Sequence, residues 1–166
     1  DTDYRGRIKT LASSKLAIAR EVAAADLVIG SVLIPGAAAP KLVTLEMVEK
    51  MRPGSVLVDI AIDQGGCFEG SHPTTHAAPT YKVHDALYYC VTNMPGAVPQ
   101  TSTAALTNAT LPYALRIANK GWKQAMAEDA GLANGLMAHA GSVVFGPVAE
   151  ALGREHVSIE TVLAGA

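Results

Sequence analysis

The predicted fold is decided by the stretch Ser55-Val-Leu-Val-Asp-Ile-Ala-Ile62, which runs directly into Asp63-Gln-Gly-Gly66. A continuous apolar run of this length is typical of a strand buried on both faces of a parallel sheet. A second run of the same kind covers residues 26–33, and the pattern between the two runs predicts a helix over 44–51 with Thr44 as its cap. A strand, a helix and a strand with short connections predict a right-handed crossover in a parallel sheet.

Further elements extend this unit in both directions along the chain. A helix is expected over 11–25, with Ser13 or Ser14 as its N-cap. After the central strand we expect a polar loop over residues 64–79 and two strands over 81–85 and 87–92. After these we expect only helices, over residues 102–119, 122–127, 130–139 and 143–152. Pro112 is expected to kink or interrupt the longest helix, which Gly121 should end. The sequence thus predicts a doubly wound α/β part followed by a helical segment that must pack on another surface.

The composition indicates a folded domain with an apolar core. Of the 166 residues, 49% are hydrophobic and 17% are charged, which excludes a disordered chain. Lys plus Arg number 13 and Asp plus Glu 15, so the net charge of −2 argues against a nucleic-acid-binding protein, and no apolar run is long enough for a membrane span. Cys67 and Cys90 form no disulfide framework, which favours a reducing compartment, the cytoplasm.

All three main strands end in small, flexible or polar residues. They run into Ile34-Pro-Gly-Ala37, Asp63-Gln-Gly-Gly66 and Asn93-Met-Pro-Gly96. Ligands of open parallel sheets bind beyond the carboxyl ends of the strands, and glycine lets a ligand approach the backbone closely. Each segment alone is more typical of a tight turn, but three of them at one sheet edge favour a binding site.

Two aspartates of the central stretch have different expected roles. Asp63 follows the predicted strand directly and is the candidate functional carboxylate, although it would equally serve to cap the following turn. Asp59 lies inside the strand, so we expect it to accept hydrogen bonds from the backbone amides of a neighbouring loop. The five histidines lack the spacing of metal ligands, the two cysteines lack a CxxC pattern, and no GxGxxG or GxxxxGK(S/T) occurs. We therefore expect no metal site, no cysteine nucleophile and no phosphate cradle in this chain.

Three long runs of this sequence resemble alanine dehydrogenases. They are residues 25–42 (ADLVIGSVLIPGAAAPKL), 51–70 (MRPGSVLVDIAIDQGGCFEG) and 91–110 (VTNMPGAVPQTSTAALTNAT), all within residues 6–122. The alpha subunit of the proton-translocating nicotinamide nucleotide transhydrogenase is a related family, whose second strand typically ends Asp-Leu-Ala-Ala-Glu where this chain has Asp59-Ile-Ala-Ile-Asp63. The sequence is therefore identified as a member of the alanine dehydrogenase family, and the resemblance implies a fragment that lacks the N-terminal part.

The resemblance implies a two-domain enzyme, of which this chain is the later part. Residues 1–99 would form the C-terminal half of the NAD-binding Rossmann domain, and residues 100–166 would return to the substrate domain. The family oxidises L-alanine with NAD to pyruvate, ammonium and NADH, reversibly, in L-alanine catabolism, and it forms homohexamers. The Gly-rich phosphate loop, the catalytic His and the Lys and Arg that hold the substrate carboxylate would lie upstream, so this chain alone should be inactive.

The resemblance also assigns site residues. Asp63 falls on the family's second acid/base position, beside the nicotinamide ribose. The residues that would contact NAD are Ser13, Val32, Leu33, Ile60, Ala61, Ile62, Asp63, Val91, Thr92, Asn93 and Met94. Two other functions stay open: a transhydrogenase alpha subunit, which would dock on a membrane partner, and a non-catalytic dinucleotide-binding or assembly module.

Overall fold

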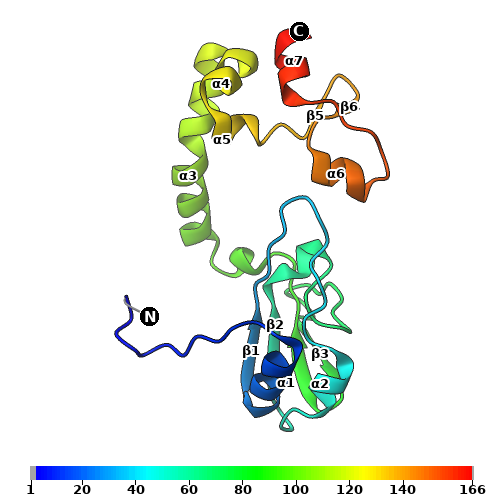
Figure 1. The fold of residues 1–166 in the computed structure, drawn as a ribbon. Coiled ribbons are helices and arrows are strands. Elements are labelled where there is room, and N and C mark those ends of the chain that lie inside the picture. Colours follow the sequence, from blue (N-terminus) through cyan, green and yellow to red (C-terminus); the bar gives the residue numbers. More distant parts are fainter. Residues whose placement is uncertain (1–2, 166) are drawn as a thin grey trace. The chain divides into compact units, whose positions relative to one another are not determined.

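The chain forms two compact units, shown in Figure 1 for the residues that the computed structural model describes, 3–165. Unit 1 comprises residues 3–33 and 39–94, and unit 2 comprises residues 34–38 and 95–165. The chain therefore leaves unit 1 once, for a five-residue segment after its first strand, before it returns to complete the sheet. The assignment of residues 1–99 and 100–166 to a cofactor domain and a substrate domain stays a prediction.

Unit 1 is built on a four-stranded sheet in the order β1-β2-β4-β3. Its strands are β1 (Leu27–Gly30), β2 (Val56–Asp59), β3 (Thr80–Val83) and β4 (Ala86–Tyr89). β1 and β4 both run parallel to β2, whereas β3 pairs with β4 in an antiparallel hairpin. The predicted α/β class with a mostly parallel sheet is confirmed.

Two helices of unit 1 begin at side-chain caps. α1 (Lys15–Ala24) begins after Ser14, whose hydroxyl accepts from the Ala17 N–H at 3.1 Å. α2 (Leu45–Glu49) begins after Thr44, whose hydroxyl accepts from the Met47 N–H at 3.3 Å. These bonds satisfy N–H groups that have no partner inside the helix. The two helices contact each other and lie on the same face of the sheet (Figure 1).

The two faces of this sheet differ in burial. The covered face lies under α1 and α2, and its side chains form the core together with those helices. Its residues are Val28, Leu57, Asp59, Tyr81, Val83, Ala86 and Tyr88. The open face carries the alternate residues Leu27, Ile29, Val56, Val58, Leu87 and Tyr89. Leu27 and Ile29 are 55% and 59% exposed. The prediction that β1 is buried on both faces is therefore wrong, because the described residues of unit 1 leave the open face of this edge strand uncovered.

The central strand is shorter than predicted. β2 ends at Asp59, and the rest of the apolar run forms a 3₁₀-helix, η1 (Ile60–Gln64), which ends at Gly65 with φ +87°. Ala61 and Ile62 are buried in this helix, whereas Ile60 is 52% exposed. The apolar run therefore marked burial only in part, and it did not mark the backbone conformation. Asp63 therefore lies on η1 rather than directly after a strand.

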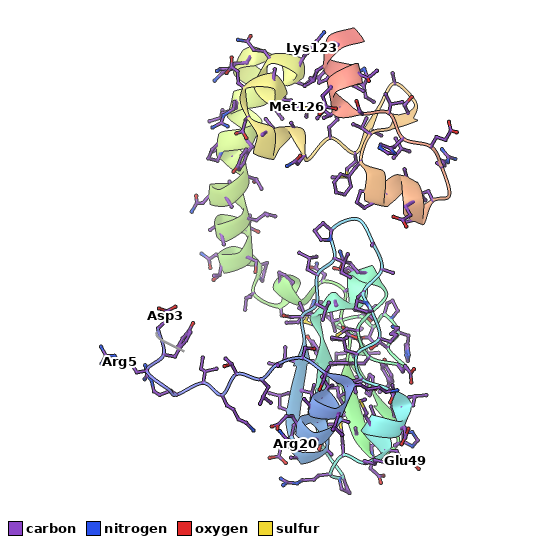
Figure 2. All side chains as sticks on the ribbon, in the orientation of Figure 1. Asp3, Arg5, Arg20, Glu49, Lys123 and Met126 are labelled. Carbon is purple, nitrogen blue, oxygen red and sulfur yellow. The ribbon has the colours of Figure 1, made fainter. Side chains whose placement is uncertain are left out.

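Unit 2 consists of helices and one short hairpin. After η2 (Met94–Ala97), its elements are α3 (Pro99–Lys120), α4 (Trp122–Glu128), α5 (Ala130–Ala133), β5 (Ala138–His139), β6 (Ser142–Val143), α6 (Gly146–Ala151) and α7 (Ile159–Gly165). α3 has no buried residue, and its side chains extend outward along its length in Figure 2. No helix within residues 3–165 combines the length and the apolar character needed to cross a membrane.

Three sequence predictions for unit 2 have different outcomes. Gly121 ends α3 as predicted, with its N–H donating to the Ile117 carbonyl at 2.8 Å. Of the kink or interruption predicted at Pro112, the interruption is wrong, because α3 runs from Pro99 to Lys120 with this proline inside it. The predicted helix over 130–139 ends early, and the β5–β6 hairpin follows. Its turn residues Ala140 and Gly141 have φ of +48° and +82°, which no right-handed helix holds.

Candidate functional site

A cavity lies where β1 and β2 end side by side. The register pairs Gly30 with Asp59, so the residues that follow the two strands lie at the same edge of the sheet. The cavity has a volume of about 360 Å³ and is lined by Ser31, Val32, Leu33, Ile60, Ala61, Asp63 and Gln64. Of the residues predicted to bind a cofactor, the structure brings five together here, namely Val32, Leu33, Ile60, Ala61 and Asp63.

The lining is mainly apolar and carries one carboxylate. Asp63 is exposed, and within the described part of the chain its carboxylate makes no hydrogen bond or ion pair. None of the seven lining residues is basic, so they offer no counter-charge for a phosphate. Such a cavity suits a flat apolar ring and the hydroxyls of an adjoining sugar, from which a carboxylate readily accepts hydrogen bonds.

Asp59 anchors the loop that follows η1 from inside the core. Its side chain is fully buried, and its carboxylate oxygens accept from the Cys67 N–H at 3.0 and 3.2 Å and from the Phe68 N–H at 3.3 Å. The Ser71 hydroxyl donates to it at 2.6 Å. Burial of a carboxylate is tolerated where donors surround it. The prediction that Asp59 has a structural role through loop amides is confirmed.

Lys41 contacts the same loop from the solvent side. Its ammonium donates to the Gly65 carbonyl at 2.5 Å and to the Gly66 carbonyl at 2.8 Å. The Ala39 N–H also donates to the Gln64 carbonyl at 2.9 Å. The sequence does not indicate this role for Lys41, since nothing in a single sequence shows which backbone carbonyls a loop lysine will reach.

The segment Val91–Met94 starts at the same sheet edge, because β4 runs parallel to β2. Its first residue is buried and forms a bridge with Thr74, and the Thr92 N–H donates to the Thr74 carbonyl at 3.4 Å. The His76 imidazole lies 2.6 Å from the Asn93 carbonyl oxygen. None of these four residues lines the 360 Å³ cavity, and their contact with a cofactor stays a prediction.

Two other predicted cofactor residues lie away from the cavity wall. Ser13 lines a separate hollow of about 290 Å³ beside α1, together with Leu11 and Ile18. Ile62 is buried in the core, and its carbonyl accepts from the Gly65 N–H at 3.0 Å. The Ile62 side chain therefore packs in the core and does not line the cavity. The structure does not bring Ser13 to the cavity either.

The two cysteines are buried free thiols. Burial, with the Asp59 carboxylate beside it, raises the pKa of the Cys67 thiol to about 11. Burial likewise raises the pKa of the Cys90 thiol above its ordinary value. Thiols with raised pKa values stay protonated near neutral pH and are poor nucleophiles. Among residues 3–165, no three His, Cys, Asp or Glu side chains are grouped so that they could hold a metal ion.

Comparison with known proteins identifies relatives of this chain. The family model described as "Alanine dehydrogenase/PNT, C-terminal domain" matches residues 1–146. The alanine dehydrogenase of Halomonas elongata is 56% identical over 163 residues, which are 98% of this chain and 44% of that protein. A solved L-alanine dehydrogenase matches with a TM-score of 0.77 and 49% identity, over 92% of this chain and 42% of that one. A solved transhydrogenase from Sinorhizobium meliloti is more distant, with a TM-score of 0.50 and 34% identity over 55% of this chain and 26% of that one.

These matches establish the fold and the family. The structural similarity confirms the predicted fold class, half of a Rossmann-type sheet followed by helices. The chain spans less than half the length of the curated relatives that it matches. The match of the family model over most of the chain shows that this protein belongs to the alanine dehydrogenase/PNT C-terminal domain family.

Proposed function

We propose that the protein containing this chain is an NAD-dependent alanine dehydrogenase. It converts L-alanine, NAD and water into pyruvate, ammonium, NADH and a proton, and it runs the reverse amination. The observation that carries this proposal is the 56% identity to an alanine dehydrogenase over 98% of the chain, a stretch that includes all the residues of the Asp63 cavity. In this proposal residues 1–99 belong to the NAD-binding domain, and residues 100–166 belong to the substrate domain.

The cavity residues fit the nicotinamide half of the cofactor better than its phosphates. Val32, Leu33 and Ile60 offer apolar walls for a ring, and Asp63 offers an acceptor for ribose hydroxyls. When bound, NAD accepts a hydride from the substrate. On the basis of the family resemblance, we propose that the cofactor is NAD rather than NADP and that Ser13 and Val91–Met94 also contact it.

Asp63 has the acid/base or orienting role in this proposal. Its carboxylate is exposed and unpaired within residues 3–165, so it is available to accept a hydrogen bond from water or from the ribose. Oxidative deamination needs such a group, because water attacks the imine carbon and protons must leave that water and reach the departing amine. The second catalytic group and the groups that hold the substrate carboxylate belong to the rest of the protein.

The test uses the whole protein with NAD and L-alanine at mildly alkaline pH, following nicotinamide reduction. Asp63→Asn is expected to lower kcat by about 10²–10⁴-fold, as removal of an acid/base group does. Asp85→Asn is the matched control, because this exposed aspartate precedes the amino end of β4, whereas Asp63 follows the carboxyl end of β2. The Asp85→Asn variant should retain full activity. Full activity in Asp63→Asn would reduce Asp63 to a turn residue. A protein that binds NADH without reducing NAD would favour the transhydrogenase or the non-catalytic module.

Three finer features complete the proposal. We infer that the protein is cytoplasmic, acts in L-alanine catabolism and forms a homohexamer. Two buried free thiols and a net charge of −2 support a reducing compartment without a nucleic-acid partner. Light scattering on the purified whole protein tests the hexamer, which a mass of one or two protomers would contradict.

A further inference from the structure

The turn that presents Asp63 is not rigid by itself. η1 spans only five residues, and Gly65 and Gly66 follow it with φ of +87° and +76°. Glycine has the largest backbone freedom of any residue, and two consecutive glycines give this turn little stiffness of its own. The position of the Asp63 carboxylate therefore depends on what holds the turn from outside.

The backbone carbonyls of the turn show how it is held. Two of them accept from N–H groups of the turn itself, each at 3.0 Å. The Gln64 carbonyl accepts from the Ala39 N–H, and the Gly65 and Gly66 carbonyls accept from the Lys41 ammonium at 2.5 and 2.8 Å. Asp59 then holds the residues that follow. Lys41 is thus the one side chain, among residues 3–165, that donates to the two glycine carbonyls.

The surroundings of Lys41 indicate that its ammonium interacts mainly with the carbonyls of the turn. Its side chain is exposed, and it forms no ion pair within the described residues. The carbonyls at the carboxyl end of a short helix carry partial negative charge and lack partners inside the helix, so an ammonium is a favourable partner for them. We propose, given the proposed function, that Lys41 is a positioning residue, which fixes the turn through the two glycine carbonyls and thereby sets the position of Asp63.

Three variants of the whole protein test this role. Lys41→Met removes the ammonium and keeps the length of the side chain, and it is expected to lower kcat about tenfold, because small misplacements of a reacting group are costly. The KM for L-alanine should change less than about threefold, since other residues hold the substrate carboxylate. Lys41→Arg keeps donors that reach two carbonyls and should retain most of the activity. Lys50→Met removes an exposed lysine paired with Glu46 on α2 and should behave as wild type.

Hydrogen exchange measures the hold on the turn without reference to activity. In Lys41→Met, amides of residues 60–66 should exchange at least about fivefold faster than in wild type, while those of β2 stay unchanged. Lys41→Arg should restore the slow exchange. Unchanged exchange over 60–66, or exchange that rises equally in β2, would overturn the proposal.

A double-mutant comparison decides whether Lys41 acts through Asp63. If it does, adding Lys41→Met to Asp63→Asn should lower kcat by less than about twofold further. A full additional tenfold loss would overturn the positioning role. If the wild-type protein shows no alanine-dependent reduction of NAD, the proposed function fails, and the exchange measurement still supports or overturns the hold of Lys41 on the turn.

Discussion

The covered and the open face of the unit 1 sheet both carry apolar strand residues, in very different surroundings. On the covered face, Leu57 and Tyr88 have no exposed surface and belong to one core cluster with Val22 of α1 and Met47 of α2. On the open face, Leu27 and Ile29 remain more than half exposed at the edge strand. A strand pattern therefore shows that a face is suited to burial, and the neighbouring elements decide whether it is buried.

This difference also bears on the rest of the protein. The open face presents an apolar row across three paired strands, with Leu27, Val56 and Leu87 side by side in register. Exposed apolar area of this kind usually marks a surface that another segment covers. We therefore expect another part of the whole protein to cover this face.

The largest expected effect is at Asp59, on the covered face. Asp59→Ala leaves two buried N–H groups and the Ser71 hydroxyl without their acceptor, so the free energy of unfolding should fall by about 3–5 kcal/mol. Asp26→Ala is the control, since among the described residues the exposed carboxylate of Asp26 forms only a surface ion pair with Arg52, and its loss should cost less than about 1 kcal/mol. Urea unfolding of the whole protein measures both changes. Equal costs for the two variants would break the comparison.

The next effect compares the faces directly. Leu57→Ala should lower the free energy of unfolding by about 2–5 kcal/mol, because it empties space in a fully packed core. Ile29→Ala, three-fifths exposed on the neighbouring strand, should cost less than about 1 kcal/mol in this chain. Urea titration of this chain measures both costs, and the same titration of the whole protein shows whether the cost of Ile29→Ala changes there. A cost of Ile29→Ala that rises in the whole protein to the level of Leu57→Ala would show that further chain covers the open face.

The sequence predicted the elements of unit 1 because local chemistry determines them. Ser14 and Thr44 cap helices as expected, and Asp59 receives the amides that a carboxylate inside a strand requires. The end of β2 was not predictable, since the apolar residues Ile60 and Ile62 are compatible with a strand as well as with a helix. A site at three strand ends was predicted, and the cavity lies at two of them, after β1 and β2. Lys41 was not predicted, because its partners are backbone carbonyls that no sequence pattern indicates.

A smaller effect is expected at Gly30, where β1 approaches the core. A Cβ added there would collide with the Cys67 sulfur and would lie 2.6 Å from the Phe68 ring. Gly30→Ala should therefore lower the free energy of unfolding by about 1–3 kcal/mol through overpacking. Gly165→Ala, with nothing within 4 Å of the added carbon, should change it by less than about 0.5 kcal/mol. A neutral Gly30→Ala would mean that the covered face is more loosely packed than its burial indicates.

The smallest effect is a loss of stability at alkaline pH. Burial raises the pKa of the Cys67 thiol from 9.0 to about 11, and it also raises the pKa of Tyr88. Above pH 9 the unfolded chain releases the thiol proton while the folded protein retains it, so the free energy of unfolding falls as pH rises toward 11. The Cys67 contribution lost by pH 10 is about 1 kcal/mol. Urea titrations at pH 8 and pH 10 should show a smaller fall in Cys67→Ala than in wild type, and an equal fall would assign the alkaline loss to groups other than this thiol.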